Sequence, residues 1–423
     1  GQVKKEKKAY NRREFIFATA AGAAAGLLAK TGLPLAAQSA QGQVQPNAEK
    51  HAKTGKQPIT RVLGRTGLRV PIVSMGVMNA DNPALVRRSF EMGIRHFDTA
   101  WGYQRGRNEE MVGAVLKELN ARDQAVIATK VPPGRPEMMD QMGAKLVEEE
   151  FLARLDQSLA RLQTDHVEIL YIHNVSDPAL LKRPGLLSAL DKAQKSKKAR
   201  FVGFSTHQGM AECIEAAVPM GRFDVILTSI NYSMADDKAL LAAMDKAAKA
   251  GIGLVAMKTQ CKQAWYREAQ SPEVQERYYE GAIWHSALLK WALRLPPVAT
   301  AIPGYTTFEQ LEADWPVAFG LEYTADETRF LSDRGIRLAL GHACRQCGGC
   351  AGSCPRGADV PALLRAHMYA ADYGNFAEMR RALDEIPGPR GLQACAGCSE
   401  CVAACVRSVQ VARRLGELRA IFA

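Results

Sequence analysis

The sequence of 423 residues lacks the features that mark several protein classes. Its hydrophobic fraction of 47% and charged fraction of 23%, with 35 Gly and 20 Pro, lie near globular averages, which excludes disordered, collagen-like and multi-span membrane proteins. The apolar run from Phe15 to Ala29 has about fifteen residues, fewer than the roughly 20 that span a bilayer. The length therefore predicts two or three globular domains with buried cores.

Cysteine is almost absent before residue 344, where only Cys213 and Cys261 occur, and we expect both to be buried. The other eight cysteines form two copies of the spacing C-x-x-C-x-x-C-x-x-x-C. Zinc sites use paired C-x-x-C units and disulfides have no reason to repeat this spacing, so two [4Fe–4S] clusters are favoured over both alternatives. In two-cluster ferredoxins the fourth cysteine of each run binds the other cluster. The predicted ligand sets are Cys344, Cys347, Cys350 and Cys405 for one cluster, and Cys395, Cys398, Cys401 and Cys354 for the other.

Nearly half of the net positive charge lies in the first 40 residues. The formal net charge is +11, and the first 40 residues contribute +5 of it through seven Lys or Arg against Glu6 and Glu14. Each oxidised cluster with four thiolate ligands carries about −2, which leaves the remaining chain near neutrality. We therefore expect no nucleic-acid partner.

The first forty residues have the composition of an export signal. Basic residues at 4–8 precede Arg12-Arg13 and Phe15, the weakly hydrophobic run follows, and small residues occupy positions 36–40. The arginine pair and Lys30 after the apolar run are similar to a twin-arginine signal, with an uncleaved basic anchor as the alternative. We expect residues 1–40 to direct export to the periplasm through the twin-arginine machinery, and residues 41–57 to form a linker.

Eight short apolar, β-branched runs alternate with amphipathic stretches over residues 58–335. The runs are 70–77, 94–100, 125–131, 167–173, 200–205, 224–231, 253–258 and 298–303. Strands and helices that alternate at this spacing pair in parallel, and eight such units match a TIM barrel. A doubly wound open sheet is the alternative, but no G-x-G-x-x-G opens a helix. The predicted class is α/β, a (β/α)8 barrel at 58–335 followed by a small, mostly helical two-cluster iron–sulfur domain at 336–423 with helices at 360–368, 376–383 and 409–422.

Polar side chains collect where the chemistry of such a barrel is expected, at the carboxyl ends of its strands. Asp98 and Tyr103 follow the second run, Lys130 ends the third and His173 ends the fourth. A lysine cation can lower the pKa of a phenol so that it donates a proton, and a carboxylate keeps that lysine charged and aimed. A histidine can orient a carbonyl oxygen. The four residues together predict protonation of a carbonyl oxygen.

These residues lie in motifs that resemble those of the aldo-keto reductases. The motifs are Gly93–Tyr103 with Glu109 and Gly113, Leu155–His173, Ala128–Lys130 and Gly203–His207. The resemblance covers residues 58 to about 320, and the C-terminal part resembles helical ferredoxin domains fused to some members. It implies Tyr103 as general acid, Lys130 and Asp98 as its tuning pair, and His173 as the residue that orients the substrate during hydride transfer from a nicotinamide.

The resemblance also implies NAD(P) as cofactor, in a site formed by Ser205, Thr206, Asn231, Lys258 and Gly304. Ser205 matches the family's serine for the carboxamide, whereas Thr206 stands where an Asn is usual. The lysine and arginine that would clamp a 2′-phosphate are replaced by Gly304 and Gln310, and Asp314 nearby would repel a phosphate. A preference for NADP therefore does not carry over to this chain.

Two functions fit these features. The first is an exported oxidoreductase that interconverts a small-molecule carbonyl and alcohol, such as a sugar, with the clusters as an electron relay to a redox partner protein or as structural elements. The second is an electron-transfer or docking protein whose barrel binds a partner. Each cluster passes one electron whereas hydride transfer moves two, and no flavin fingerprint connects them. The complete set of four catalytic residues favours the enzyme.

Overall fold

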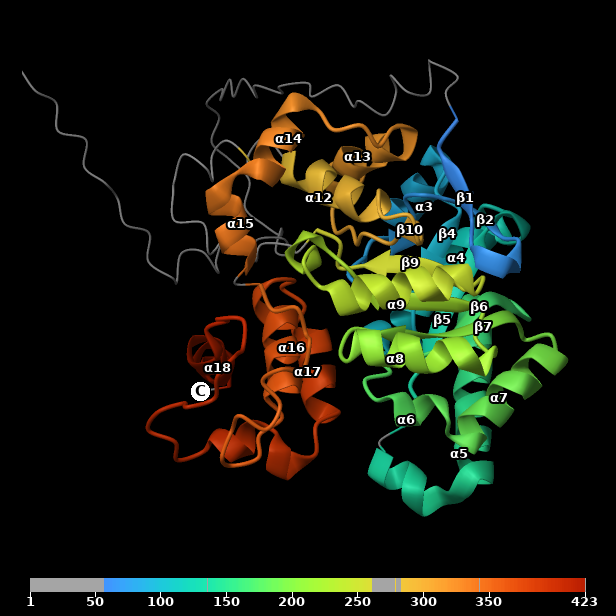
Figure 1. Cartoon of the computed structure of the whole chain (residues 1–423). Coiled ribbons are helices and arrows are strands. Elements are labelled where there is room, and N and C mark those ends of the chain that lie inside the picture. The colour runs from blue at the N-terminus through green and yellow to red at the C-terminus, as the bar shows by residue number, and fades with distance from the viewer. Residues whose placement is uncertain (1–56, 135, 261–277, 279–282, 342, 423) are drawn as a thin grey trace, which may run out of the picture. The chain divides into compact units, whose positions relative to one another are not determined.

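The computed structural model describes residues 57–134, 136–260, 278, 283–341 and 343–422 (Figure 1). The predicted export signal, nearly all of the predicted linker and Cys261 lie outside these residues. Among the residues that are described, no helix is long and apolar enough to cross a membrane.

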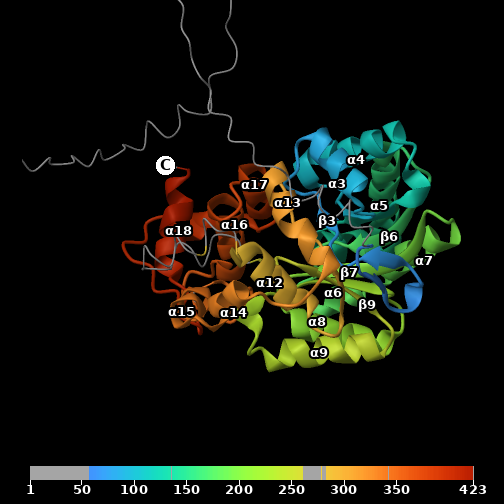
Figure 2. The same cartoon turned by 90° about the horizontal axis from the view of Figure 1, so that it is seen from above.

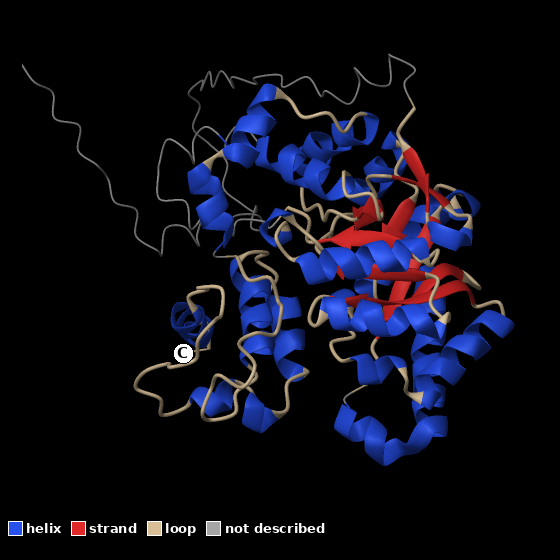
Figure 3. Ribbon diagram, viewed as in Figure 1, coloured by secondary structure: helices blue, strands red, loops and turns tan. Residues whose placement is uncertain are grey.

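Eight parallel strands form a nearly closed barrel, as predicted, with helices outside them (Figure 3). In chain order the strands are β3 (Met75–Gly76), β4 (His96–Asp98), β5 (Val126–Val131), β6 (Val167–Ile172), β7 (Ala199–Thr206), β8 (Val225–Ser229), β9 (Gly253–Met257) and β10 (Val298–Ala301). Each strand pairs with the next, and isolated parallel bridges from Val73 to Ala301 and from Gly76 to Gly304 connect the first and last. The carboxyl ends of all eight strands therefore meet at one end of the barrel.

The helices that alternate with the strands cover the outside of the barrel. They are α3 (Pro83–Met92), α4 (Arg107–Glu118), α5 (Pro136–Leu162), α6 (Pro178–Leu181), α7 (Pro184–Lys195), α8 (Met210–Ala217), α9 (Lys238–Lys249), α12 (Ile283–Leu293) and α13 (Phe308–Asp314). Several begin at side-chain caps, such as Asn82 before α3 and Asp237 before α9, which accept hydrogen bonds from free backbone N–H groups. Their apolar faces and the outward side chains of the strands form one large core that includes the buried Cys213.

The first predicted strand, 70–77, is divided between two sheets. Residues Arg69–Pro71 form β2, which pairs antiparallel with β1 (Thr60–Val62), and only Met75–Gly76 enters the barrel as β3. The turn between β1 and β2 carries Leu63, which packs against the inward side chains Ile169, Leu227 and Val255. The hairpin therefore contributes a side chain to the barrel interior, a role that an apolar run alone does not reveal.

The C-terminal region is helical. Helices α14 (Ala325–Ser332) and α15 (Arg334–Gly341) pack on α12 through Phe330, Ile336 and Trp284, so the expected domain boundary at 335/336 lies within α15. Beyond them α16 (Val360–Ala371) packs against α17 (Phe376–Asp384) and α18 (Val411–Ala420), close to the predicted helices (Figure 2). The described residues from 343 onward contain no strand. They are called the cluster domain below.

The cluster domain contacts the barrel through polar pairs. Asn375 Nδ2 donates to Asn79 Oδ1 at 2.8 Å, and Asn174 Nδ2 donates to Glu385 Oε2 at 3.5 Å. Because Asn375 caps the N-terminus of α17 and Glu385 follows its last residue, both ends of this helix are attached to loops that follow barrel strands.

The close approach of β8 to Gly203 on β7 provides a test of how these two strands pair. A Cβ at this position would lie 1.8 Å from the carbonyl oxygen of Val225 on β8. We expect Gly203→Ala to lower the free energy of unfolding by about 1–3 kcal/mol or more, measured by urea denaturation followed by circular dichroism. Gly320→Ala, where nothing lies within 4 Å of the added carbon, is the matched control and should be within about 0.5 kcal/mol of the parent. Equal stability of the two variants would contradict the described pairing of β7 and β8.

Candidate active site and cluster ligands

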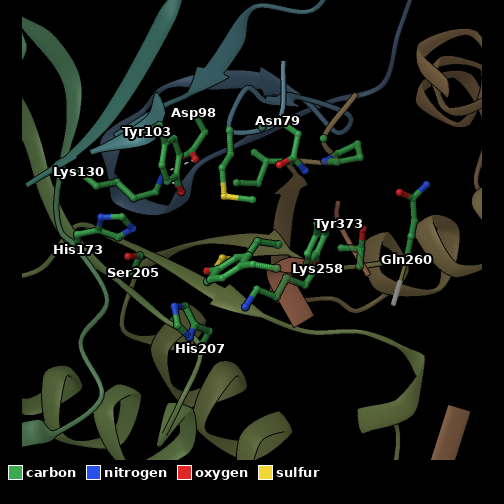
Figure 4. A pocket seen from close by; sticks show the side chains of 18 residues that line it. Asn79, Asp98, Tyr103, Lys130, His173, Ser205, His207, Lys258, Gln260 and Tyr373 are labelled. Carbon is green, nitrogen blue, oxygen red and sulfur yellow. Dashed lines mark hydrogen bonds and ion pairs between the residues drawn. The ribbon is translucent and has the colours of Figure 1, made fainter. Parts of the chain in front are cut away.

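A cavity of about 100 Å³ opens at the carboxyl ends of the barrel strands (Figure 4). It is lined by all four predicted catalytic residues, Asp98, Tyr103, Lys130 and His173. Tyr369 on α16 and Tyr373 just after it also line the cavity. The cluster domain therefore forms part of the wall of the barrel's active-site cavity.

Tyr103, Lys130 and Asp98 are buried in direct contact. Lys130 on β5 pairs with the Asp98 carboxylate at the end of β4 and donates to the Thr99 carbonyl at 2.7 Å. The same ammonium lies 3.4 Å from Tyr103 Oη and 4.8 Å from the centre of its ring. Lys130 is 1% exposed and Asp98 2% exposed, so water does not screen the pair. The geometry brings together the three residues that sequence placed on neighbouring strands.

The pKa of Tyr103 is raised, contrary to the expectation that Lys130 lowers it. Burial is the main cause, and the negative charges of Asp98 and Glu378 add to it, while Arg381 acts in the opposite direction. Asp98 offsets part of the attraction that Lys130 offers to a phenolate, so the pKa of Tyr103 is lowered less than it would be beside an isolated cation, and burial prevails. Tyr103 therefore keeps its proton at neutral pH and is a donor rather than a phenolate.

His173 follows β6 and meets Tyr103 edge to face, with ring centroids 5.7 Å apart. Its backbone N–H donates to the Val131 carbonyl at 2.9 Å, which fixes it beside β5. Burial lowers the pKa of His173 far below its usual value, and the charges of Arg381, Lys130 and Arg365 add to the effect. The ring is neutral, so one nitrogen can donate to a carbonyl oxygen while the other accepts.

Glu109 on α4 belongs to one of the family-like motifs but was not among the predicted site residues. It supports the positions of the catalytic side chains. Its buried carboxylate accepts from Thr129 Oγ1 at 2.6 Å and from Arg161 at 3.2 Å, and Arg161 also donates to the Trp101 carbonyl at 2.9 Å. The network holds the loop that carries Tyr103. The cavity residues His207, Tyr369 and Tyr373 were not among the predicted site residues. For the two tyrosines the reason is that they come from a segment with no sequence link to the barrel.

The five predicted cofactor residues divide into two groups. Ser205, Lys258 and Gly304 line the cavity. Thr206 and Asn231 do not: the Thr206 hydroxyl donates to the Gln208 carbonyl at 3.2 Å, and Asn231 Nδ2 donates to the Lys258 carbonyl at 3.3 Å. Successive residues of a strand point to opposite faces, so Ser205 and Thr206 cannot both face the barrel interior. Asn231 instead supports Lys258, a non-glycine residue with φ of +58°.

The positions expected to lie near a 2′-phosphate make contacts within the chain. Gln310 accepts from the Thr306 N–H at 2.8 Å, so its carbonyl is occupied locally. Asp314 accepts from Gln260 and is 1% exposed, and burial raises its pKa to about 7. It therefore faces inward rather than toward a phosphate, which corrects its expected role.

The structure brings the eight C-terminal cysteines together in two groups. After burial, the charges of Cys347 and Cys405 raise the pKa of the Cys344 thiol, and these two and Cys344 raise that of Cys350. In the same way the charges of Cys354, Cys398 and Cys401 raise the pKa of the Cys395 thiol. The second set lines a cavity of about 360 Å³. Among the described residues no group is arranged around a single metal ion, whereas a cubane cluster needs thiolates spread around a larger volume. The donor set and the cavity fit a [4Fe–4S] cluster.

Comparisons with known proteins agree with this architecture. Residues 74–329 match the model of the aldo/keto reductase family and residues 343–410 match a 4Fe-4S dicluster domain. The chain is 32% identical over 208 residues to L-galactose dehydrogenase of Arabidopsis thaliana, which covers 46% of this chain and 63% of that protein. It is 36% identical over 159 residues to L-glyceraldehyde 3-phosphate reductase of Escherichia coli, which covers 35% of this chain and 45% of that protein. The chain thus spans less than two thirds of these relatives' length.

The fold is also that of a solved aldo-keto reductase from Bacillus halodurans, at a TM-score of 0.51 and 18% identity over 69% of this chain and 97% of that one. With the barrel, its buried tyrosine–lysine–aspartate group and the matching family model, this chain belongs to the aldo/keto reductase family and carries a C-terminal 4Fe-4S dicluster domain.

Proposed function

We propose that this protein is an exported oxidoreductase that interconverts a carbonyl and an alcohol on a small polyhydroxylated molecule, with Tyr103 as general acid and base. The observation that carries the proposal is the neutral, buried Tyr103 beside the Lys130–Asp98 pair and His173 in one cavity. Carbonyl reduction adds a hydride to carbon and a proton to oxygen. These four residues can donate the proton to the oxygen.

The proton follows a short path in this proposal. His173 donates to the carbonyl oxygen and orients it, and Tyr103 transfers its proton to the same oxygen as negative charge develops there. The phenolate that remains lies 3.4 Å from the Lys130 ammonium, whose charge then stabilises it. In the direction of alcohol oxidation the same steps run in reverse. A nicotinamide supplies the hydride in the chemistry that the family resemblance implies.

The names of similar proteins support the substrate class. They include L-galactose dehydrogenase and a D-threo-aldose 1-dehydrogenase of a Pseudomonas species, both named for sugars. A screen of aldoses, aldehydes and sugar alcohols under anaerobic conditions, with NADH, NADPH or a one-electron dye as the redox partner, tests the activity. Absence of turnover with every combination would overturn the proposal.

The clusters fit an electron relay because the predicted ligands of one of them lie near the active-site cavity. Lys258 Nζ, which lines the cavity, donates at 3.1 Å to Gln346, which lies between the predicted ligands Cys344 and Cys347. A relay of this kind serves a redox partner protein that docks on the cluster domain. Export through the twin-arginine route fits the same design, since clusters assembled before transport require a folded cargo.

Replacing Tyr103 with Phe should lower the rate of carbonyl reduction by about 10²–10⁴-fold, because the variant lacks the donated proton. Steady-state kinetics on the cluster-loaded protein measure the change. Tyr171→Phe removes a buried hydroxyl with no partner among the described residues and should leave the rate unchanged. Full turnover by Tyr103→Phe would remove it as the general acid.

Nucleotide titration should show no preference for NADPH over NADH. A 2′-phosphate is held by charge-assisted hydrogen bonds worth about 1.5–3 kcal/mol each, and the two family cations that make them are replaced in this chain. Quenching of tryptophan fluorescence during titration gives both dissociation constants. Binding of NADPH a hundredfold tighter than NADH would show that another cation, such as Lys258, holds the phosphate.

Changing Arg12 and Arg13 together to Lys should leave the protein in the cytoplasm with its clusters assembled, because charge is kept while the arginine pair is lost. Cell fractionation and iron analysis measure the outcome. Unchanged recovery from the periplasm would favour general secretion, and membrane recovery would favour an anchor.

A further inference from the structure

A second, larger cleft adjoins the active site on the side of the cluster domain. It has a volume of about 620 Å³ and is lined by Trp101, Gly102 and Asn174 from the barrel and by Arg365, Arg381 and Glu385 from the cluster domain. His173 lines both this cleft and the catalytic cavity. A molecule in the cleft can therefore reach His173, which also lines the catalytic cavity with Tyr103, while the rest of the molecule lies against α17.

Arg381 lines the larger cleft and lies beside the loop that carries Tyr103. Its side-chain Cδ lies against Gly102, so close that a Cβ there would be 3.3 Å away, and Gly102 immediately precedes Tyr103. The charges of Glu378 and Arg381 both act on the pKa of Tyr103. The attachments of α17 through Asn375 and Glu385 fix both ends of the helix that carries Arg381.

The hydrogen bonds of Arg381 leave part of the guanidinium for a ligand. Its Nε donates to the Glu378 carboxylate at 2.9 Å, and its two terminal nitrogens pair with Glu378 and Glu385. Within the described part of the chain these bonds use three of the five N–H groups that a guanidinium carries. Two N–H groups remain to donate to oxygen atoms in the cleft.

The charges around the cleft favour a neutral ligand. Five arginines line it and each has a carboxylate partner: Arg154 with Glu150, Arg183 with Asp140, Arg365 with Glu385, Arg381 with Glu378 and Glu385, and Arg390 with Asp359. A phosphate or carboxylate brought to Arg381 would be repelled by Glu378 and Glu385 on either side. A hydroxyl group carries no charge, can accept from the guanidinium and can donate to the carboxylates.

We propose that Arg381 of the cluster domain is a specificity-determining residue, which holds the hydroxyl groups next to the reacting carbonyl of a neutral polyhydroxylated substrate. The inference rests on the proposed carbonyl–alcohol activity and goes beyond it, because it assigns part of the substrate site to the iron–sulfur domain. The clusters then have a second role, since they hold α16 and α17 where the substrate site needs them.

Two aldehydes of equal chain length test this assignment. Glyceraldehyde carries two hydroxyl groups and propanal carries none, and kcat and KM for each are measured on the cluster-loaded full chain. In the parent protein we expect a higher kcat/KM for glyceraldehyde. Arg381→Met should reduce kcat/KM for glyceraldehyde by about tenfold to a hundredfold, chiefly through KM, and change that for propanal less than about twofold.

Arg380→Met is the matched control, because Arg380 is the neighbouring exposed arginine of the same helix and should change neither value. Cluster absorbance shows whether each variant is folded. If Arg381→Met loses its clusters, Arg381→Lys replaces it, and a several-fold loss confined to glyceraldehyde is the expected result, since an ammonium keeps the charge without the guanidinium fork.

Three outcomes would overturn the inference and leave the proposed function intact. They are equal kcat/KM for the two aldehydes in the parent protein, an equal loss for both in Arg381→Met, and a higher kcat/KM for glyceraldehyde 3-phosphate than for glyceraldehyde. Failure of the parent protein to turn over any aldehyde or alcohol would instead count against the proposed function.

Discussion

The structure of the active site depends on one buried ion pair, Lys130 with Asp98. Taking both charges out of water is costly, and only their close contact, with the hydrogen bond from Lys130 to the Thr99 carbonyl, offsets that cost. The pair has a consequence for catalysis, because Asp98 offsets part of the attraction between Lys130 and a phenolate at Tyr103. Tyr103 keeps its proton in the resting state, and the ammonium is in place when a phenolate forms.

The cluster domain forms part of the wall of the active-site cavity rather than a separate module. Tyr369 and Tyr373 line the cavity, and Glu378 and Arg381 contribute to its electrostatics. A short helical segment of this kind has too little apolar surface to hold its position by itself, and cysteine ligation of clusters supplies additional cross-links. Electron relay and structural support are therefore compatible roles for the same clusters.

Much of the fold could be predicted from local sequence patterns. The alternation of β-branched runs with amphipathic stretches predicted the eight parallel strands, and the repeated cysteine spacing predicted two groups of cysteines, because both signals lie within short windows of sequence. The exception was the 70–77 run, where the division between a hairpin and the first barrel strand depends on contacts between Leu63 and distant strands.

For the site, the sequence alone determined that Asp98, Tyr103, Lys130 and His173 stand at the carboxyl ends of strands, and the structure places all four around one cavity. The sequence also determined the uncharged character of positions 304 and 310. Only the tertiary structure decided that Thr206 and Asn231 lie outside the cavity. It also decided that the pKa of Tyr103 is raised by burial rather than lowered by Lys130, and that Arg381 lies against Gly102. The physical reason is that burial and long-range charge depend on which segments pack together, and residues 103 and 381 are brought together by packing rather than by any pattern in the chain.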